Sequence, residues 1–600
     1  MASQKADHKI LVDSGIPVGI KSGLVKRALW LLMIVAFCVL AFAVRCWNLR
    51  DVFVGGRIYF VDPDCYSRMT RAASIAEGGP LVIRHHDFEN WPDGITPHTT
   101  APLDWLIVAG KWIADCGLRI ADSGKTSVLR GQTLDLAGAL ISPLLGALTC
   151  GWLAAWSWSA ARHSSLLARH AIFAAPLFFA ISPIAVHGGA LGRPDHQSLV
   201  MLLLAIIIGA EVRLMQTVRE WEKSARPPNR HIAKWSIIGG VAGGLAMWVS
   251  LYEPLILFAV IFVLIGALDR EQFRWRERWL GWAIAAAIYA ASLVIDGWRI
   301  SLPDESVRTY FANWSRSIGE LAHLDPTDSL LWRWCGWAIA IAPVTLGVAV
   351  WLKMKAARAS VGAHPAYRPA AFLLGLLVVT FALTCWQLRW GYFFALTFAM
   401  SLPWQLAVAR RAWIAWPVFL ISLYPVAQDW DARLFPDDEA RQEHAMQRAE
   451  RAALRRFASV IAASGPGAAF LAPWWQSPAV AYWSRHPGVA GSSHQSLPGI
   501  VDTARFFLTD KPDEAAAIVK KRRVAWVLVD DAERMASTSA SLLGIVPPAV
   551  PLGSTLTQNP RNVPPLLHEQ PQPPVEIAPG ETGGQIFFRL YAVDSANLPP

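Results

Sequence analysis

The chain has 600 residues, of which 54% are hydrophobic and only 17% are charged, and its mean hydropathy is +0.32. Soluble proteins carry about 25% charged residues, so this composition excludes a wholly soluble protein and predicts an integral membrane protein with extramembrane parts. The net charge of +10 does not indicate nucleic-acid binding. Arg and Lys gather in short loops between apolar runs, as the positive-inside rule expects.

The first 428 residues predict a cytoplasmic tail followed by a multi-span domain. Residues 1–27 are polar, end in Lys26-Arg27 and show no cleavable signal peptide. Apolar runs then recur, and about 20 apolar residues suffice for one crossing. The expected spans are 28–46, 133–158, 171–188, 198–216, 236–251, 254–269, 279–297, 331–352, 370–388, 390–408 and 412–428.

One further apolar run, 103–118, is interrupted by Asp104, Lys111 and Asp115. A charge at the bilayer centre costs about 2.5–3.5 kcal/mol, so we expect an amphipathic helix lying in the membrane interface. This choice keeps basic loops such as 217–234 in the cytoplasm. We therefore expect a multi-pass plasma-membrane (inner-membrane) protein. Its expected exoplasmic, or periplasmic, segments are 47–132, 189–197, 298–330 and 429–600.

The last of these segments, 429–600, predicts a water-soluble α/β domain of ordinary size. We expect a helix over 511–521, and the proline-rich run 547–578 predicts a loop or strap without secondary structure of its own. Short apolar runs predict buried strands at 468–472, 524–529 and 586–590.

The seven cysteines do not predict a disulfide framework. Cys65 and Cys116 fall in the same expected exoplasmic loop, which would allow a bond between them. The sequence has no CxxC, HExxH, P-loop or GxGxxG context, which argues against ATP-driven transport, zinc hydrolysis and dinucleotide chemistry.

Three acidic stretches fall at the expected outer ends of separate helices. They contain Asp62 and Asp64, then Asp195 within Gly192–Gln197, then Glu320. Each alone is explained by a helix cap or a solvated loop charge. Carboxylates gathered from separate elements repel one another unless a cation joins them, and all-oxygen ligation suits Mg²⁺ or Mn²⁺ better than zinc. Their joint occurrence on one face therefore predicts a metal site.

A lone arginine, Arg389, marks the outer break between two spans. A guanidinium at this depth suits a phosphate or pyrophosphate at the lipid headgroup level. Taken singly, it is equally explained as an interfacial anchor beside Trp390.

This combination resembles the catalytic subunit of oligosaccharyltransferase, including the single-subunit bacterial and archaeal enzymes, over most of the chain. Asp62-Pro63 to Arg68 is similar to the first acidic motif of that family, and Gly192–Gln197 to the second. The remaining similar stretches are Ser317-Ile318-Gly319-Glu320 (the Ser/Thr-Ile/Val-x-Glu motif), Arg389 (the arginine directed at the lipid pyrophosphate) and Pro473-Trp474-Trp475 (the Trp-Trp-Asp motif).

The resemblance implies a GT-C membrane glycosyltransferase fold with a divalent metal held by Asp62, Asp195 and Glu320. The metal would act as a Lewis acid on the pyrophosphate of a polyprenyl-linked glycan donor while an acceptor attacks the anomeric carbon. The family's acceptor is an asparagine in a short Asn-x-Ser/Thr segment of a polypeptide. The supporting residues implied are Asp64, His196 and Gln197 beside the metal, Arg389 at the pyrophosphate, and Trp474, Trp475 and Gln476 at the acceptor.

Two departures affect what the resemblance implies. Gln197 replaces the second carboxylate of the second motif, and Gln476 stands where the family has the aspartate that reads the acceptor's hydroxyl. A neutral amide still accepts a hydrogen bond, but without charge and with different geometry. We expect an oligosaccharyltransferase-like enzyme with a protein asparagine as acceptor. The alternatives are a transferase with a hydroxyl, glycan or lipid acceptor, and a polyprenyl-glycan transporter or binding protein without transfer activity.

Overall fold

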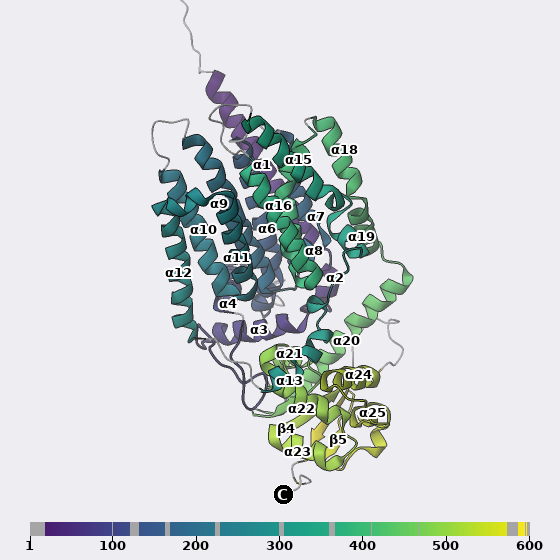
Figure 1. Cartoon of the computed structure of the whole chain (residues 1–600). Helices are drawn as coiled ribbons and strands as arrows, with labels where there is room; N and C mark the ends of the chain where they lie inside the picture. Colours follow the sequence, from purple (N-terminus) through teal and green to yellow (C-terminus); the bar gives the residue numbers. More distant parts are fainter. Residues whose placement is uncertain are drawn as a thin grey trace, which may run out of the picture.

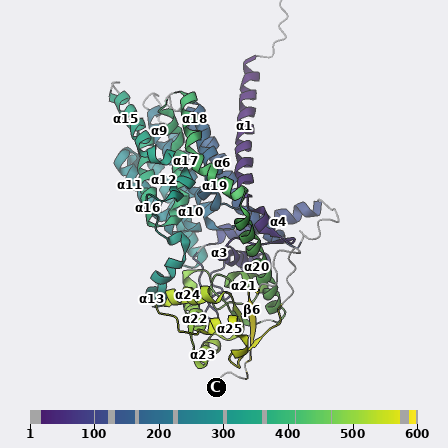
Figure 2. The ribbon, with the colours of Figure 1, turned by 90° about the vertical axis from the view of Figure 1, so that its right-hand side faces the viewer.

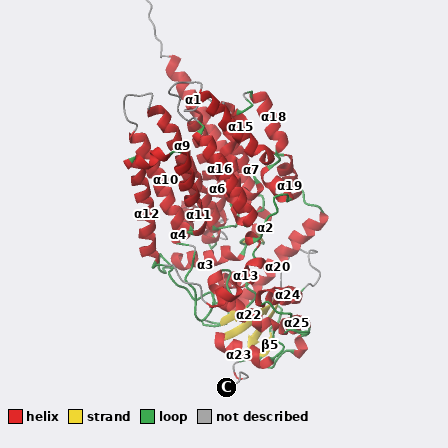
Figure 3. Ribbon diagram, viewed as in Figure 1, coloured by secondary structure: helices red, strands yellow, loops and turns green. Residues whose placement is uncertain are grey.

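The computed structural model consists of a helix bundle and a smaller C-terminal domain that lies against one end of it (Figures 1 and 3). We call this end of the bundle the domain end. The structure describes residues 18–98, 100–120, 131–162, 169–221, 229–298, 305–358, 367–409, 411–465, 467–572, 586–594 and 596.

Seven helices within the described residues are long and apolar enough to cross a membrane. Most pack side by side in the bundle, and α1 stands along its edge in Figure 2. Their bounds are α1 (Val18–Arg45), α6 (Thr133–Arg162), α9 (His196–Trp221), α10 (Asn229–Val249), α12 (Arg276–Asp296), α15 (Ala338–Arg358) and α16 (Arg368–Trp386). The multi-pass α-helical fold expected from the sequence is confirmed.

The other expected spans are shorter or broken helices. Prolines explain two of the breaks, because a proline lacks the N–H that continues a helix and therefore begins a new one at Pro183 and near Pro425. Helix α17 is buried over nearly its whole length by its neighbours. The bounds are α7 (Ala174–Ile181), α8 (Pro183–His187), α11 (Tyr252–Leu268), α17 (Gly391–Ala407), α18 (Ala412–Ser422) and α19 (Tyr424–Leu434).

Two helices at the domain end are not part of the bundle. They are α3 (Pro63–Ala76) and α4 (Ala101–Ile120), and Figure 2 shows α4 lying across the direction of α1. Asp104 is buried in α4 against arginines of α3, whereas Trp112 and Ile113 are exposed. This orientation agrees with the amphipathic interfacial helix expected over 103–118. The disulfide considered between these helices is wrong, because Cys65 is buried, Cys116 is exposed and both are free.

The C-terminal domain follows the long helix α20 (Asp438–Ala462) and contains a four-stranded mixed sheet. The strand order is β3-β4-β6-β5, with β3 parallel to β4 and the other two pairs antiparallel. The strands are β3 (Ala469–Leu471), β4 (Val524–Val529), β5 (Leu567–Glu569) and β6 (Arg589–Val593). The helices are α21 (Ser477–Ser484), α22 (Leu497–Leu508), α23 (Pro512–Arg522), α24 (Ala532–Leu543) and α25 (Leu552–Gln558).

The α/β class of this domain is confirmed, with two corrections. The third strand begins at Arg589 rather than residue 586. The run 547–578 is not without structure, because it contains α25 and β5. Its prolines leave residues 552–558 free to form a helix, and Leu552 and Leu556 bury one face of that helix.

Candidate active site between the bundle and the C-terminal domain

Asp62 is fixed at the N-terminus of α3. Its Oδ1 accepts a hydrogen bond from the backbone N–H of Cys65 at 3.0 Å, and Pro63 occupies the first helical position. This is an N-cap with a proline placed where its missing N–H has no cost. The carboxylate is therefore held in place by the start of α3.

The backbone joins the first acidic stretch to the second. Val61 N–H donates to Gly192 O at 3.0 Å, which brings Asp62 beside the residues that follow Gly192. Gly192 has φ +74°, and a Cβ there would lie 2.8 Å from Val52 and 3.2 Å from Tyr59 O. Only glycine adopts this positive φ without strain and also leaves room for Val52 and Tyr59, because it has no Cβ.

Arg193 lies at the centre of the acidic residues. Its Nη2 is 2.8 Å from Glu320 Oε1, and its Nη1 is 3.5 Å from Asp62 Oδ2 and 3.0 Å from His187 Nε2. The arginine side chain is buried. Sequence analysis quoted Arg193 within the second motif but gave it no role. The available signal was its position two residues before Asp195, as the one charged group besides that aspartate in Gly192–Gln197.

Glu320 is placed by a short turn, Gly319–Leu321, and by α17. Tyr392 Oη donates to Glu320 Oε1 at 3.1 Å and also contacts His187 Nδ1 at 3.0 Å. Neither His187 nor Tyr392 was singled out from the sequence. They complete a ring of contacts that orients Glu320 toward Arg193.

Asp195 precedes α9 and contacts the next residue. Its Oδ1 accepts from the backbone N–H of His196 at 2.6 Å and is 2.7 Å from His196 Nδ1. Gln197 is 4% exposed, and its Oε1 has no hydrogen-bond partner among the described residues. A buried amide oxygen without a partner is a feature that a cation could satisfy.

Asp64 faces a small hollow in the protein next to Asp195, with a volume of about 40 Å³. Burial and, to a smaller extent, the charges of Asp62 and Asp195 raise the pKa of Asp64 to about 7, although a hydrogen bond to Ser492 of the C-terminal domain opposes the shift. Glu89, another wall of the hollow, is buried and accepts a hydrogen bond from Ser67.

The site carries more negative charge than its arginines balance. Seven carboxylates and four arginines lie here, and the raised pKa values of Asp64 and Glu89 mean that protons neutralise part of the excess. The carboxylates are Asp62, Asp64, Glu89, Asp104, Asp195, Glu253 and Glu320, and the arginines are Arg68, Arg71, Arg193 and Arg389. This excess and the orphaned Gln197 oxygen fit a hard divalent cation.

The three predicted ligands nevertheless do not form a ready ligand cluster. Within the described ranges, no three His, Cys, Asp or Glu side chains are close enough to hold a metal ion. The reason is that the Arg193 guanidinium lies between Asp62 and Glu320.

Arg389 lies next to the Glu320 turn, because Leu388 N–H donates to Ala322 O at 2.9 Å. Its guanidinium forms an ion pair with the buried Glu253 of α11. Burial lowers the pKa of Arg389, but the charges of Glu253 and Glu320 raise it overall. Sequence analysis missed Glu253, although it is the one charged residue in the apolar helix α11.

Trp474, Trp475 and Gln476 lie between β3 and α21. Trp475 Nε1 donates to Asp530 Oδ2 at 2.8 Å, and Gln476 Nε2 is 3.3 Å from Glu450 Oε1 and 3.5 Å from Asp530 Oδ2. The Gln476 amide is thus a donor to two carboxylates that sequence analysis did not identify. Trp474 packs against Trp314, three residues before the Ser317–Glu320 stretch, with 6.3 Å between ring centroids.

Comparison with known proteins gives structural matches only. No protein-family model and no curated protein matches the sequence. The archaeal oligosaccharyltransferase AglB from Archaeoglobus fulgidus, solved with an inhibitory peptide and a dolichol-phosphate, is 15% identical with a TM-score of 0.62, over 86% of this chain and 71% of that chain. The Archaeoglobus fulgidus enzyme tethered to an acceptor peptide containing an NVT sequon is 16% identical with a TM-score of 0.61, over 86% and 72%.

A third similar structure is the arabinofuranosyltransferase AftD from Mycobacteria, at 15% identity and a TM-score of 0.51, over 94% of this chain and 40% of that chain. Likeness at this identity establishes architecture. The chain therefore shares the fold of these structures, and this likeness confirms the GT-C type of architecture expected from the sequence.

Proposed function

We propose that the chain is a membrane glycosyltransferase that moves a glycan from a polyprenyl-(pyro)phosphate donor to an acceptor on the side of the C-terminal domain. The observation that carries this proposal is the junction of Asp62, Asp195 and Glu320 around Arg193, where three separate segments meet. Helix α3, which follows Asp62, lies at the domain end of the bundle, and the C-terminal domain that follows α20 lies beyond it (Figure 1). We assign that end to the exoplasmic side.

Asp62, Asp195 and Glu320, with Gln197 Oε1, are the oxygens that would hold Mg²⁺ or Mn²⁺. When bound, the metal supplies Lewis-acid stabilisation of charge on the leaving phosphate. Asp62 is oriented by its cap, and Tyr392 orients Glu320. The Archaeoglobus fulgidus oligosaccharyltransferase, which shares this fold, has been solved in complex with zinc and sulfate.

The donor phosphate is assigned to Arg389. Its guanidinium lies at the turn beside Glu320, where it balances Glu253 and keeps further N–H donors for a phosphate. The dolichol-phosphate bound to the archaeal oligosaccharyltransferase is a ligand of this chemical class.

A protein asparagine is the leading acceptor, and Trp474, Trp475 and Gln476 are proposed to contact it. The peptide with an NVT sequon bound to the archaeal enzyme supports this choice. The Gln476 amide is directed at Glu450 and Asp530, so the group that would read a sequon is a carboxylate pair rather than one aspartate.

Transfer by the purified protein from a polyprenyl-pyrophosphate glycan to an Asn-x-Thr peptide tests the function. Asp62→Ala, Asp195→Ala and Glu320→Ala should each lower the rate by at least about 10²–10³-fold, as loss of transition-state charge stabilisation does. Asp437→Ala, at the exposed cap of α20, should keep the rate. Chelation should stop transfer, and Mn²⁺ should restore it. Equal rates in all four variants would exclude the proposed site.

A further inference from the structure

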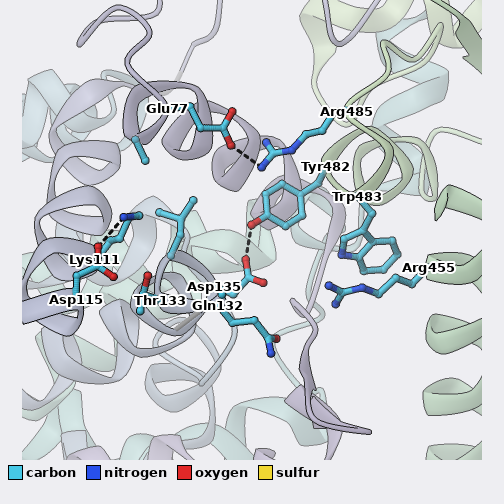
Figure 4. A pocket seen from close by; sticks show the side chains of 13 residues that line it. Glu77, Lys111, Asp115, Gln132, Thr133, Asp135, Arg455, Tyr482, Trp483 and Arg485 are labelled. Carbon is cyan, nitrogen blue, oxygen red and sulfur yellow. Dashed lines mark hydrogen bonds and ion pairs between the residues drawn. The ribbon is translucent and has the colours of Figure 1, made fainter. Parts of the chain in front are cut away.

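A second, larger cavity lies at the C-terminal end of α3, whereas Asp62 caps the N-terminal end. Its volume is about 620 Å³, and its walls come from the end of α3, from α4, from the start of α6 and from α20 and α21 of the C-terminal domain (Figure 4). Ligand pockets commonly have volumes of about 300–1,000 Å³. Helix α3 has 14 residues and rises about 1.5 Å per residue, so the wall at Glu77 is about 20 Å from Asp62. Tyr482 and Trp483, on another wall, pack against Phe60 and Tyr59.

The walls of the cavity are polar and balanced in charge. They contain three cations, on Lys111, Arg455 and Arg485, and three carboxylates, on Glu77, Asp115 and Asp135. Lys111 Nζ is 2.6 Å from Asp115 Oδ2, and Arg485 Nη2 is 2.8 Å from Glu77 Oε1. A balanced wall gives a phosphate or an ammonium group no net attraction.

Paired charges still leave hydrogen-bonding capacity. An ammonium has three donors, a guanidinium five, and a carboxylate accepts several hydrogen bonds, so the ion pairs of Lys111 and Arg485 use only part of it. Asp135 accepts a hydrogen bond from Tyr482 Oη, as Figure 4 shows, and Thr133 adds a hydroxyl. The cavity therefore offers donors and acceptors together.

Two aromatic side chains of α21 supply the apolar part of the wall. Tyr482 and Trp483 border the cavity, and the Arg455 guanidinium carbon is 5.5 Å from the centre of the Trp483 ring. The Arg485 guanidinium carbon is 5.4 Å from the centre of the Tyr482 ring. Sugar residues present an apolar C–H face and a rim of hydroxyls that donate and accept, which matches an uncharged wall containing both aromatic and hydrogen-bonding groups.

We propose that this cavity binds uncharged sugar residues of a glycan, as a binding site separate from the catalytic carboxylates. The proposal that this cavity binds sugars does not depend on the proposed transfer function. Its role, to hold sugars of the donor or acceptor glycan that lie far from the reacting carbon, rests on the proposed transfer function. Because α6 belongs to the bundle and α21 to the C-terminal domain, a bound glycan also joins the two parts.

Glycine positions allow the cavity to be filled without repacking. Gly131 lines the cavity, and a Cβ there meets no atom within 4 Å. Gly131→Trp therefore places a large side chain at the cavity, and Gly117→Trp on α4, where a Cβ also meets no atom, is the matched control outside it. Arg485→Gly removes one guanidinium and keeps the end of α21, because residue 485 has φ +62°, which glycine adopts without strain.

Saturation-transfer NMR on the full-length protein in nanodiscs measures binding of maltotriose and tri-N-acetylchitotriose, with phosphocholine and inorganic phosphate for comparison. At least one neutral trisaccharide should bind wild type, Gly117→Trp and Asp62→Ala. Gly131→Trp and Arg485→Gly should each weaken that binding at least tenfold. The proposal is overturned if no neutral sugar binds, if phosphocholine or phosphate binds in preference, or if binding is unchanged in both cavity variants. Sugar binding kept by Asp62→Ala separates this result from failure of the transfer function.

Transfer kinetics then distinguish the two sources of the sugar. If the cavity holds the donor glycan, Gly131→Trp raises KM for a donor with several sugars and leaves KM for a single-sugar donor unchanged. If it holds an acceptor glycan, the rise is in KM for the glycosylated acceptor. Unchanged KM values for both substrates would overturn the assigned role.

Discussion

Arg193 is the residue on which the geometry of the acidic site depends. Its guanidinium separates Asp62 from Glu320 and contacts both, so it takes the place of a cation among these carboxylates. If the proposed metal binds here, Arg193 and the metal would compete for the same oxygens. Removing one partner of a buried ion pair typically costs about 3–5 kcal/mol, because the other charge is left uncompensated.

We expect Arg193→Gln to lower the melting temperature of the metal-free protein and to be rescued by Mn²⁺. A metal that binds only the folded protein stabilises it by mass action, and loss of the guanidinium leaves the metal more negative charge to bind. The control is Arg278→Gln, which breaks another buried pair, with Glu211 at 2.6 Å. Thermal unfolding with and without Mn²⁺ decides. Equal rescue of the two variants would show that Arg193 does not compete with a metal.

Gln476 allows a prediction about pH. Burial raises the pKa of Glu450, and the charge of Asp530 adds to this. Gln476→Asp adds a third carboxylate beside both and should raise the pKa of Glu450 further. Because the folded pKa then exceeds the unfolded pKa, stability is complete below the unfolded pKa and is lost as pH rises through the folded one.

The melting temperature of Gln476→Asp, relative to wild type, should therefore fall as pH rises above the ordinary carboxylate pKa of about 4.3. Gln476→Asn keeps a neutral amide and should show no such slope. A flat pH dependence for Gln476→Asp would mean that Glu450 and Asp530 do not face residue 476.

At this scale the sequence predicted the charged residues that lie in the segments between apolar runs and not their partners. Asp62, Asp195, Glu320 and Arg389 were identifiable because each interrupts the chain at the end of an apolar run. Glu253 lies inside an apolar helix, and its contact with Arg389 joins residues 136 positions apart. Nothing local in the sequence encodes such a pairing.

Among the elements, α3 links the site to helix stability. Asp62 has two roles, as a cap through its Oδ1 and as a charge through its Oδ2. Asp62→Asn keeps a good cap and removes the charge, whereas Asp62→Ala removes both. A lost cap costs about 1 kcal/mol.

We expect both variants to lose transfer and Asp62→Ala to melt at a lower temperature than Asp62→Asn, because only the alanine also removes the cap. Thermal unfolding and transfer assays on the same preparations separate the two roles. Retained transfer in Asp62→Asn would contradict a charge-based role for this residue.

Secondary-structure elements were predicted correctly where one local sequence signal was strong. Strand β4 and helix α23 agree with the apolar run and the helix start expected there. Strand β5 and helix α25 were not predicted, because each is short and depends on packing against a distant segment. Helix α25 packs against β4, and β5 pairs with β6. Proline spacing was the available signal for α25, and β5 had none in its own residues.

Over the whole molecule, the segment between α3 and α4 holds the C-terminal domain against the bundle through residues 88–93. Arg522 is buried and reaches across from α23, with Nη1 at 3.0 Å from Trp91 O and 3.2 Å from Asp93 Oδ2, and Nε at 2.7 Å from Asp502 Oδ2. A backbone hydrogen bond, from Gly488 N–H to Phe88 O at 3.0 Å, joins the same two parts.

Arg522→Ala should loosen this attachment, because a buried carbonyl and a carboxylate lose their donor. Hydrogen exchange of residues 86–95 should become at least tenfold faster, and transfer should fall with it. The neighbouring Arg523→Ala is the matched control, since Arg523 is exposed. Unchanged exchange in Arg522→Ala would mean that this contact does not hold the domain.

The central claim is tested most directly by mass spectrometry of acceptors after the protein, in membranes supplied with polyprenyl-linked glycans, is incubated with Mn²⁺. The account predicts a covalent glycan on the acceptor, at asparagine in an Asn-x-Ser/Thr peptide, formed by wild type and absent with Asp62→Asn, Asp195→Asn or Glu320→Gln. Product formed equally by these variants, or a donor that remains intact with every acceptor tried, would contradict it.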